Sequence, residues 1–291
     1  MIRGIIRFGF CPAMLLGVNG AALWLVSVGA PKIWLLFLLL AAIAASFAAE
    51  RISPYEPAWN RSLGDGRRDT LHAVVNESAN FGTLLLLPVL TSLLAIDGIW
   101  PREWSFPAQV LLAIVVDVGI TLAHYASHRL DLLWRFHAVH HSVKRMYGFN
   151  GLMKHPIHQA IETVAGTTPL VLMGLPPSVA LALVFCVAVQ LLLQHSNVDY
   201  SVGPLRYALA INEVHRFHHQ KDPVLGDVNF GLFTTAVDHL LGTFHWEPRA
   251  GRFTSEELGI GAEPHYPVAY VPQLLEPFRR RSASEFAGEL G

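Results

Sequence analysis

The stretch DVGITLAHYASHRLDLLWRFHAVHHS, residues 117–142, holds five of the fifteen histidines of the chain. His124 and His128 are four residues apart, and the other three follow at intervals of three and one: His137, His140 and His141. Side chains at positions i, i+3 and i+4 share one face of a helix. Each of these two groups can therefore direct its imidazoles toward one point.

A second cluster with the same spacing occupies the segment EVHRFHHQKD, residues 213–222, and contains His215, His218 and His219. Two adjacent histidines at a helix-face spacing from a third have no packing rationale, whereas imidazole is the commonest metal ligand. Finding this HxxHH arrangement twice, beside an HxxxH pair, predicts a metal-binding protein. Four other histidines fit hydrogen-bonded core positions instead: His72, His239, His245 and His265.

The number of clustered histidines exceeds what one metal ion takes. A single zinc ion has four ligands, and a catalytic one takes three from the protein. The eight histidines therefore predict two ions. Zinc, copper and iron all accept imidazole, so the spacing leaves the metal open. The segment from His124 to His128 lacks the glutamate of the HExxH pattern, which argues against zinc-protease chemistry.

Composition points to a membrane protein. Hydrophobic residues make up 52% of the 291 residues, charged residues only 15%, and the mean hydropathy is positive. A net charge of −1 gives no sign of nucleic-acid binding. Cys11 and Cys186 lie within apolar runs, which indicates buried, inert thiols without a disulfide framework.

The hydropathy pattern predicts an all-α membrane bundle. About four transmembrane helices, each near the ~20 residues that cross a hydrocarbon core, are expected at residues 10–30, 33–49, 79–99 and 106–126. Residues 156–194 form a further apolar region, broken at Gly174-Leu175-Pro176-Pro177, which predicts a membrane-embedded helical hairpin, re-entrant or spanning. A secretory signal is the alternative at the N-terminus, but no convincing cleavage site follows.

Three regions are expected along the chain. Residues 1–70 form an N-terminal transmembrane hairpin with a polar linker, residues 71–250 a catalytic domain whose helical cap holds the dinuclear metal site, and residues 251–291 a peripheral tail. Most basic residues near the spans fall on one side, which the positive-inside rule makes cytoplasmic. The clustered histidines are therefore expected on the cytoplasmic side of a multi-pass protein.

The order HxxxH, HxxHH, a second HxxHH, NFG and then a D-x-x-x-GTF block resembles the fatty acid hydroxylase and sterol desaturase superfamily over residues 117–244, roughly half of the chain. That resemblance implies an integral-membrane, di-iron oxygenase that hydroxylates or desaturates a lipid such as a sterol or a fatty acyl chain. It implies two iron ions as cofactors, O₂ as co-substrate, and an electron donor protein of the ferredoxin, cytochrome b5 or reductase type. No catalytic side chain beyond the metal centre is expected.

The resemblance also implies the ligands. They are His124, His128, His137, His140, His141, His215, His218 and His219, with His195 as the ninth. Two departures leave this set whole and leave the subfamily and substrate open. The usual HP-x-E appears here as His155-Pro156-Ile157-His158, and the tryptophan and phenylalanine of the W-D-x-x-F-G-T block are Val237 and Leu241.

Metal-bound histidines usually donate their second ring N–H to a carboxylate or carbonyl. Asp117 leads the candidates for this role, because it lies seven residues before His124, on the same helical face, at a depth where an unpaired charge is expensive. Weaker candidates are Asn229, Asp238, Glu213, Asp222 and Asp199, together with His155. His155 and His158 fit a ligand, a contact behind the ligands, or packing.

Two further alternatives stay open at this level. Arg129, Arg135, Lys144 and Arg145 suit an electron donor or phospholipid headgroups, or simply a basic membrane-facing edge. A histidine-rich membrane protein that binds or transports metal without oxygenase activity is the competing function. A transporter would place its ligands near the bilayer midplane on broken helices.

Overall fold

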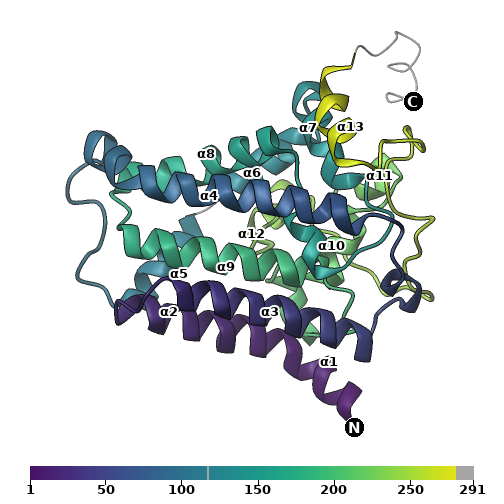
Figure 1. Ribbon diagram of the computed structural model, residues 1–291, viewed down its shortest axis with the longest axis horizontal. Helices are drawn as coiled ribbons and strands as arrows, with labels where there is room; N and C mark the ends of the chain where they lie inside the picture. The colour runs from purple at the N-terminus through teal and green to yellow at the C-terminus, as the bar shows by residue number, and fades with distance from the viewer. Residues whose placement is uncertain (117, 280–291) are drawn as a thin grey trace.

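The computed structural model describes residues 1–116 and 118–279. Within these ranges the chain is helical, and isolated β-bridges take the place of strands. Figure 1 shows the long helices side by side in one bundle. Shorter helices gather at one end: α7 (Asp131–His141), α10 (Asn212–His218), α11 (Pro223–Gly226) and α13 (Tyr270–Leu275). The prediction of an all-α fold is confirmed.

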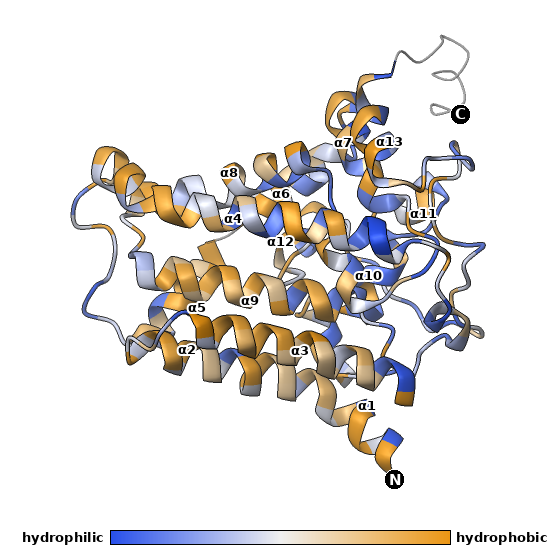
Figure 2. Ribbon diagram, in the orientation of Figure 1, coloured by the Kyte–Doolittle hydropathy of each residue, from blue (hydrophilic) through white to orange (hydrophobic). Residues whose placement is uncertain are grey.

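Five helical stretches in the described residues are long and apolar enough to cross a membrane. They are Ile2–Ser27, built from α1 (Ile2–Pro12), the π-helical η1 (Ala13–Val18) and α2 (Asn19–Ser27); α3 (Ile33–Ile52); α4 (Gly66–Leu94); Phe106–Ser127, which contains α5 (Phe106–Val116) and α6 (Val118–Ser127); and α9 (Pro177–His195). The first four correspond to the four predicted spans, and α9 to the second helix of the predicted hairpin. In Figure 2 the spans are mostly orange, and hydrophilic segments gather at the end that bears α10.

The third span differs from its prediction. Helix α4 begins at Gly66 and ends at Leu94, whereas hydropathy predicted a helix over residues 79–99. Its first turns carry polar side chains that resemble a linker in the sequence, yet Arg68, Asp69 and His72 are buried in the fold. The helix forms there because these groups have partners inside the protein.

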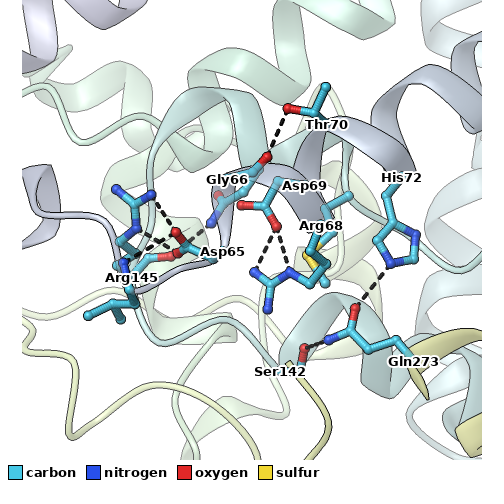
Figure 3. Close-up of polar contacts among 12 residues, drawn as sticks. Asp65, Gly66, Arg68, Asp69, Thr70, His72, Ser142, Arg145 and Gln273 are labelled. Carbon is cyan, nitrogen blue, oxygen red and sulfur yellow. Dashed lines mark hydrogen bonds and ion pairs between the residues drawn. The ribbon is translucent and has the colours of Figure 1, made fainter. Parts of the chain in front are cut away.

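Figure 3 shows those partners. Asp65, directly before α4, accepts two hydrogen bonds from Arg145, at 2.7 and 2.8 Å. Arg68 donates to Asp69 at 2.7 Å. His72 contacts Gln273, which in turn donates to Ser142. Hydrogen bonds thus connect the beginning of α4 to the segment that follows α7 and to α13.

The predicted hairpin is present as α8 (Pro156–Met173) and α9. Gly174 ends α8 with a φ of 88°, a left-handed conformation that glycine adopts without strain. Pro177 then begins α9 at a position where its missing N–H costs nothing. Helix α9 is the most buried of the five candidate spans and packs against α2, α4 and α5, so it forms the centre of the bundle.

A short 3₁₀ segment, η3 (Gly148–Leu152), crosses the polar half of α9 at close range. A Cβ atom on Gly151 would lie 2.4 Å from the carbonyl oxygen of Leu191, so only glycine fits there. This approach brings η3 next to His195, the last residue of α9.

The remaining elements are short and lie outside the five spans. They are η2 (Pro57–Asn60), η4 (Gly203–Tyr207), α12 (Ala236–Leu241) and η5 (Glu276–Phe278). Part of the C-terminal segment packs into the fold, since Phe253, Leu258 and Gln273 are buried. Cys11 and Cys186 are buried and free, as the sequence predicted.

Candidate metal centre

Nine histidines converge in two groups at the ends of four helices. The first group contains His124, His128, His137, His141 and His218, and the second His140, His195, His215 and His219. Within each group the ring nitrogens that can bind a metal all lie within 4.8 Å of one another. These are the nine residues that the family resemblance implied.

Each HxxHH segment contributes to both groups. On α7, His137 and His141 are four residues apart and enter the first group, while His140 enters the second. On α10 the assignment is reversed, because the pair four residues apart, His215 and His219, enters the second group. Each of the two helices therefore contributes histidines to both groups, and neither group can form from one helix alone.

The distances between ring nitrogens suit ligands of a shared ion. In the first group the Nε2 atom of His218 is 2.8 Å from that of His124, and the Nε2 atoms of His137 and His141 are 3.0 Å apart. In the second group Nε2 of His215 lies 3.2 Å from Nε2 of both His195 and His219. Two nitrogens that each sit about 2.1 Å from one ion are about 3 Å apart.

Backbone carbonyls fix the orientation of several rings. The Nδ1–H groups of His124, His140 and His218 donate to the carbonyl oxygens of Phe230, Met153 and Val228, at 2.9, 2.8 and 2.8 Å. A carbonyl oxygen only accepts, so these bonds place the proton on Nδ1 and leave the Nε2 lone pair free to bind metal.

Asn150 performs the same task for the ninth histidine. Its side-chain oxygen lies 3.0 Å from Nδ1 of His195 and its amide nitrogen donates to the carbonyl of Arg145. Asn150 belongs to η3, so the close packing of η3 on α9 delivers this contact. No sequence pattern indicated this role, because Asn150 lies outside every histidine motif.

Burial keeps the imidazoles outside the spans neutral. It is the main cause that lowers the pKa values of His137, His141 and His219 well below the usual value, and neighbouring histidines add to the effect. Burial lowers the pKa of His218 to about 4. Only a neutral imidazole offers a lone pair to a metal, so these side chains are ready to bind at neutral pH.

The predicted carboxylate of Asp238 and the predicted amide of Asn229 hydrogen-bond the backbone near the imidazoles. Asp238 accepts hydrogen bonds from the backbone N–H groups of Phe230 and Gly231, at 2.8 and 2.9 Å. Asn229, with a φ of 57°, donates to the carbonyls of Val214 and His245. Both residues therefore shape the loop whose carbonyls receive His124 and His218. Asp117 lies outside the described residues.

His155 and His158 belong to neither group of converging nitrogens. His155 caps α8, where its Nδ1 accepts from the backbone N–H of Ile157 at 3.1 Å. The ring of His158 packs 4.4 Å from that of His137, and its Nε2 lies 3.0 Å from the hydroxyl of Ser127. Both histidines thus support the surrounding structure.

A small cavity of about 20 Å³ lies between the groups, enough for about one water-sized molecule. His124, His140 and His195 line it, together with a buried ion pair between Lys154 and Glu162. The pair was not anticipated from the sequence. Its only signal was an acidic residue within the apolar run of α8.

The donor set fits a dinuclear transition-metal site. Nine imidazole nitrogen donors suit zinc, copper or iron, and four to five per group match one ion each with room for a further ligand. No carboxylate joins either group among the described residues. The site thus combines converging donors, a fixed tautomer at several rings and a space for one small molecule.

Comparison with known proteins agrees with this geometry. The family model Fatty acid hydroxylase matches residues 109–243. The chain is 33% identical over 267 residues to the ornithine lipid hydroxylase OlsE of Rhizobium tropici, covering 88% of this chain and 79% of that protein. It is 31% identical over 150 residues to the alkylglycerol monooxygenase of Danio rerio, covering 50% of this chain and 31% of that protein. The human alkylglycerol monooxygenase is 29% identical over 149 residues, 51% of this chain and 32% of that protein.

No solved structure matches the chain. The match to the ornithine lipid hydroxylase nevertheless extends well beyond residues 109–243 and covers most of both proteins. Together with the five candidate spans, it makes this protein a multi-pass membrane oxidoreductase. The chain belongs to the fatty acid hydroxylase family.

Proposed function

We propose that this protein is a di-iron oxygenase that hydroxylates, or desaturates, a membrane lipid with O₂ and external electrons. The observation that carries the proposal is the convergence of nine histidines in groups of five and four. A carbon–hydrogen bond of a lipid chain is too inert for amino-acid side chains, so a metal cofactor must supply the oxygen chemistry.

The residues of the chain have separate tasks in this proposal. The histidines bind the two ions, and the carbonyls of Val228, Phe230 and Met153 hold three of the rings in the binding tautomer. The apolar residues Ile120, Leu191 and Leu232 line the cavity beside them and exclude bulk water. In sum, hydroxylation consumes the lipid (RH), O₂, two electrons and two protons, and yields the hydroxylated lipid (ROH) and water.

The electrons come from a donor protein on the cytoplasmic side. The basic residues beside the spans support this orientation through the positive-inside rule. Arg145 is not part of a docking surface, because it is buried and paired with Asp65. Arg129 pairs with Asp227, which leaves Arg135 and Lys144 as the basic residues of the predicted cluster without a carboxylate within 4.0 Å among the described residues.

The relatives direct the choice of substrate. The extensive match to an ornithine lipid hydroxylase makes an ornithine lipid the first substrate to test, and the partial matches make alkylglycerol lipids the second. A transporter is less well supported, because the nine histidines lie at helix ends and beyond them rather than at breaks in the middle of spans.

Lipid extracts test the reaction directly. Cells that produce the wild-type protein are compared with cells that produce His140→Ala, because His140 belongs to the second group and its removal should abolish turnover. We expect a lipid that has gained one oxygen atom in the wild-type extract alone. A lipid that has lost two hydrogen atoms would assign desaturation. Identical extracts at equal protein levels would contradict oxygenase activity.

Asn150 offers a milder test of the site. Replacing it with alanine removes the oxygen that faces His195, and losses of such contacts lower metal affinity about 10- to 100-fold. We expect that decrease in a metal-competition titration of Asn150→Ala. Asn150→Asp keeps an acceptor oxygen and should retain most of the affinity. Equal affinities for wild type and Asn150→Ala would show that this contact does not orient His195.

A further inference from the structure

An apolar groove of about 410 Å³ lies between three of the candidate spans. Helices α3, α4 and α9 form its walls, with Leu36 and Leu39 on α3, Phe81 and Leu84 on α4, and Val184 and Ala188 on α9. Both α3 and α4 precede residues 109–243, so two of the three walls lie outside the family region.

The groove and the candidate metal centre both use one face of α9. Val184 and Ala188 line the groove, whereas Leu191 and His195 line the cavity between the histidine groups. These four positions are spaced by four, three and four residues and therefore share one helical face. The eleven helical rises from Val184 to His195 span about 16 Å.

The polar groups of the groove lie toward opposite ends. Glu77 is the groove residue of α4 closest to the end of the bundle that holds the histidines, and Lys32 precedes α3 at the other end. Glu77 is partly buried, and its carboxyl group hydrogen-bonds Asn80. An ionisable group within a span is expensive and usually serves a function. The oxygens of a carboxyl group facing an apolar groove can accept a hydrogen bond from a bound molecule.

We propose that this groove holds the alkyl chain of the substrate, with the polar end toward Glu77 and the methyl end toward Lys32. The carboxyl group of Glu77 selects a lipid that presents an N–H donor, an amide or an amine, where its chain begins. The inference rests on the proposed function, since it assumes a lipid substrate. It assigns substrate selection to α3 and α4.

Several observations favour an alkyl chain as the occupant. The groove lies among candidate spans with exposed apolar side chains, such as Leu36 in the groove at 49% and Leu85 outside it at 61% exposure. Its walls are almost entirely apolar, and its α9 residues lie on the helical face that further along lines the cavity of the histidine groups. A chain lying there brings the carbons next to its polar end closest to the site.

A photoactivatable lipid tests occupancy without requiring turnover. The probe is an N-acyl amide lipid with a diazirine in the middle of its chain, added to membranes that contain the full-length protein. After illumination, we expect adducts on groove residues of α3, α4 and α9, and an excess of the same lipid without diazirine should displace them. Adducts spread over the outer surface of α5 with no displacement would overturn the proposal.

Two substitutions that fill the groove from different helices sharpen the test. Val184→Trp and Leu39→Trp should each reduce adduct formation and product at least tenfold while bound metal stays unchanged. Val115→Trp is the control, because Val115 is 61% exposed on α5 and lies outside the groove. Unchanged adducts in both groove variants would contradict the proposal.

The role of Glu77 has its own comparison. Glu77→Leu should weaken adduct formation with the amide lipid about tenfold, whereas Glu77→Gln, which keeps an acceptor, should remain within about twofold. Equal losses, or stronger labelling by a lipid with a carboxylate at that position, would overturn the selection of an N–H donor.

Failure of the groove and failure of the oxygenase are separable. Groove adducts in wild type and in His140→Ala, without any oxidised lipid, would sustain the groove and contradict the proposed function. Oxidised lipid in wild type, with adducts and turnover unaffected by Val184→Trp and Leu39→Trp, would sustain the proposed function and contradict the groove.

Discussion

Replacing His141 or His219 with alanine is expected to reduce hydroxylation by more than about 100-fold, since even partners behind metal ligands contribute 10- to 100-fold. His141 belongs to the first histidine group and His219 to the second, and their rings pack 4.6 Å apart. Each substitution should also lower the bound metal, because each ion loses one of its four or five nitrogens. Product formation and metal content per chain are measured on the same preparations.

His265→Ala is the matched control, because His265 is exposed, contrary to the core position that the sequence predicted, and lies outside both groups. It should retain wild-type metal content and turnover. If His141→Ala loses product but binds the full complement of metal, then His141 is not a ligand. If only one of the two ligand variants affects activity, a single ion suffices for the reaction and the dinuclear assignment is wrong.

Asp65→Asn is expected to destabilise the protein by about 3–5 kcal/mol, the usual cost of leaving one partner of a buried ion pair alone. Asp65 and Arg145 are 4% and 7% exposed, and two hydrogen bonds join them. The loss should appear in the free energy of unfolding measured by denaturant titration in detergent micelles. Asp97→Asn, at an exposed carboxylate, should change that free energy by less than about 0.5 kcal/mol.

The same pair predicts a pH dependence. Burial acts to raise the pKa of Asp65, but the hydrogen bonds and charge of Arg145 outweigh it and hold the pKa below its usual value of 3.8. A carboxylate with a lowered folded-state pKa stabilises the protein above the unfolded pKa, and that contribution disappears as pH falls through the folded value. Wild type should therefore lose this stability below about pH 4, and Asp65→Asn should lack that component. Parallel acid profiles for the two proteins would contradict the assignment.

The clustering of eight of the nine histidines was accessible from the sequence, because helical spacing places residues three and four apart on one face, whereas only the family resemblance implied His195. The division of the histidines between the two groups could not be predicted from the sequence. His137 and His140 lie on the same turn of α7 yet belong to different groups, because the ring of His137 packs against His124 of α6 and the ring of His140 against His195 of α9. These contacts depend on tertiary packing, which no local sequence pattern records.

The polar start of α4 escaped prediction for a related reason. Hydropathy treats Arg68 and Asp69 as linker residues, and only their burial together permits a helix from Gly66. Asn150 and the pair of Lys154 with Glu162 were missed because each is an isolated polar residue along the chain. They become part of the site through the packing of η3 and α8 against the histidine helices.

Metal analysis of the purified wild-type protein tests the central claim most directly. Elemental analysis with protein quantified by amino-acid composition, together with an absorption spectrum for haem, gives the number and identity of the ions per chain. We predict about two non-haem iron ions, as two groups of four to five histidines require. A haem spectrum, a single ion per chain, or zinc in place of iron in fully active protein would contradict the di-iron centre.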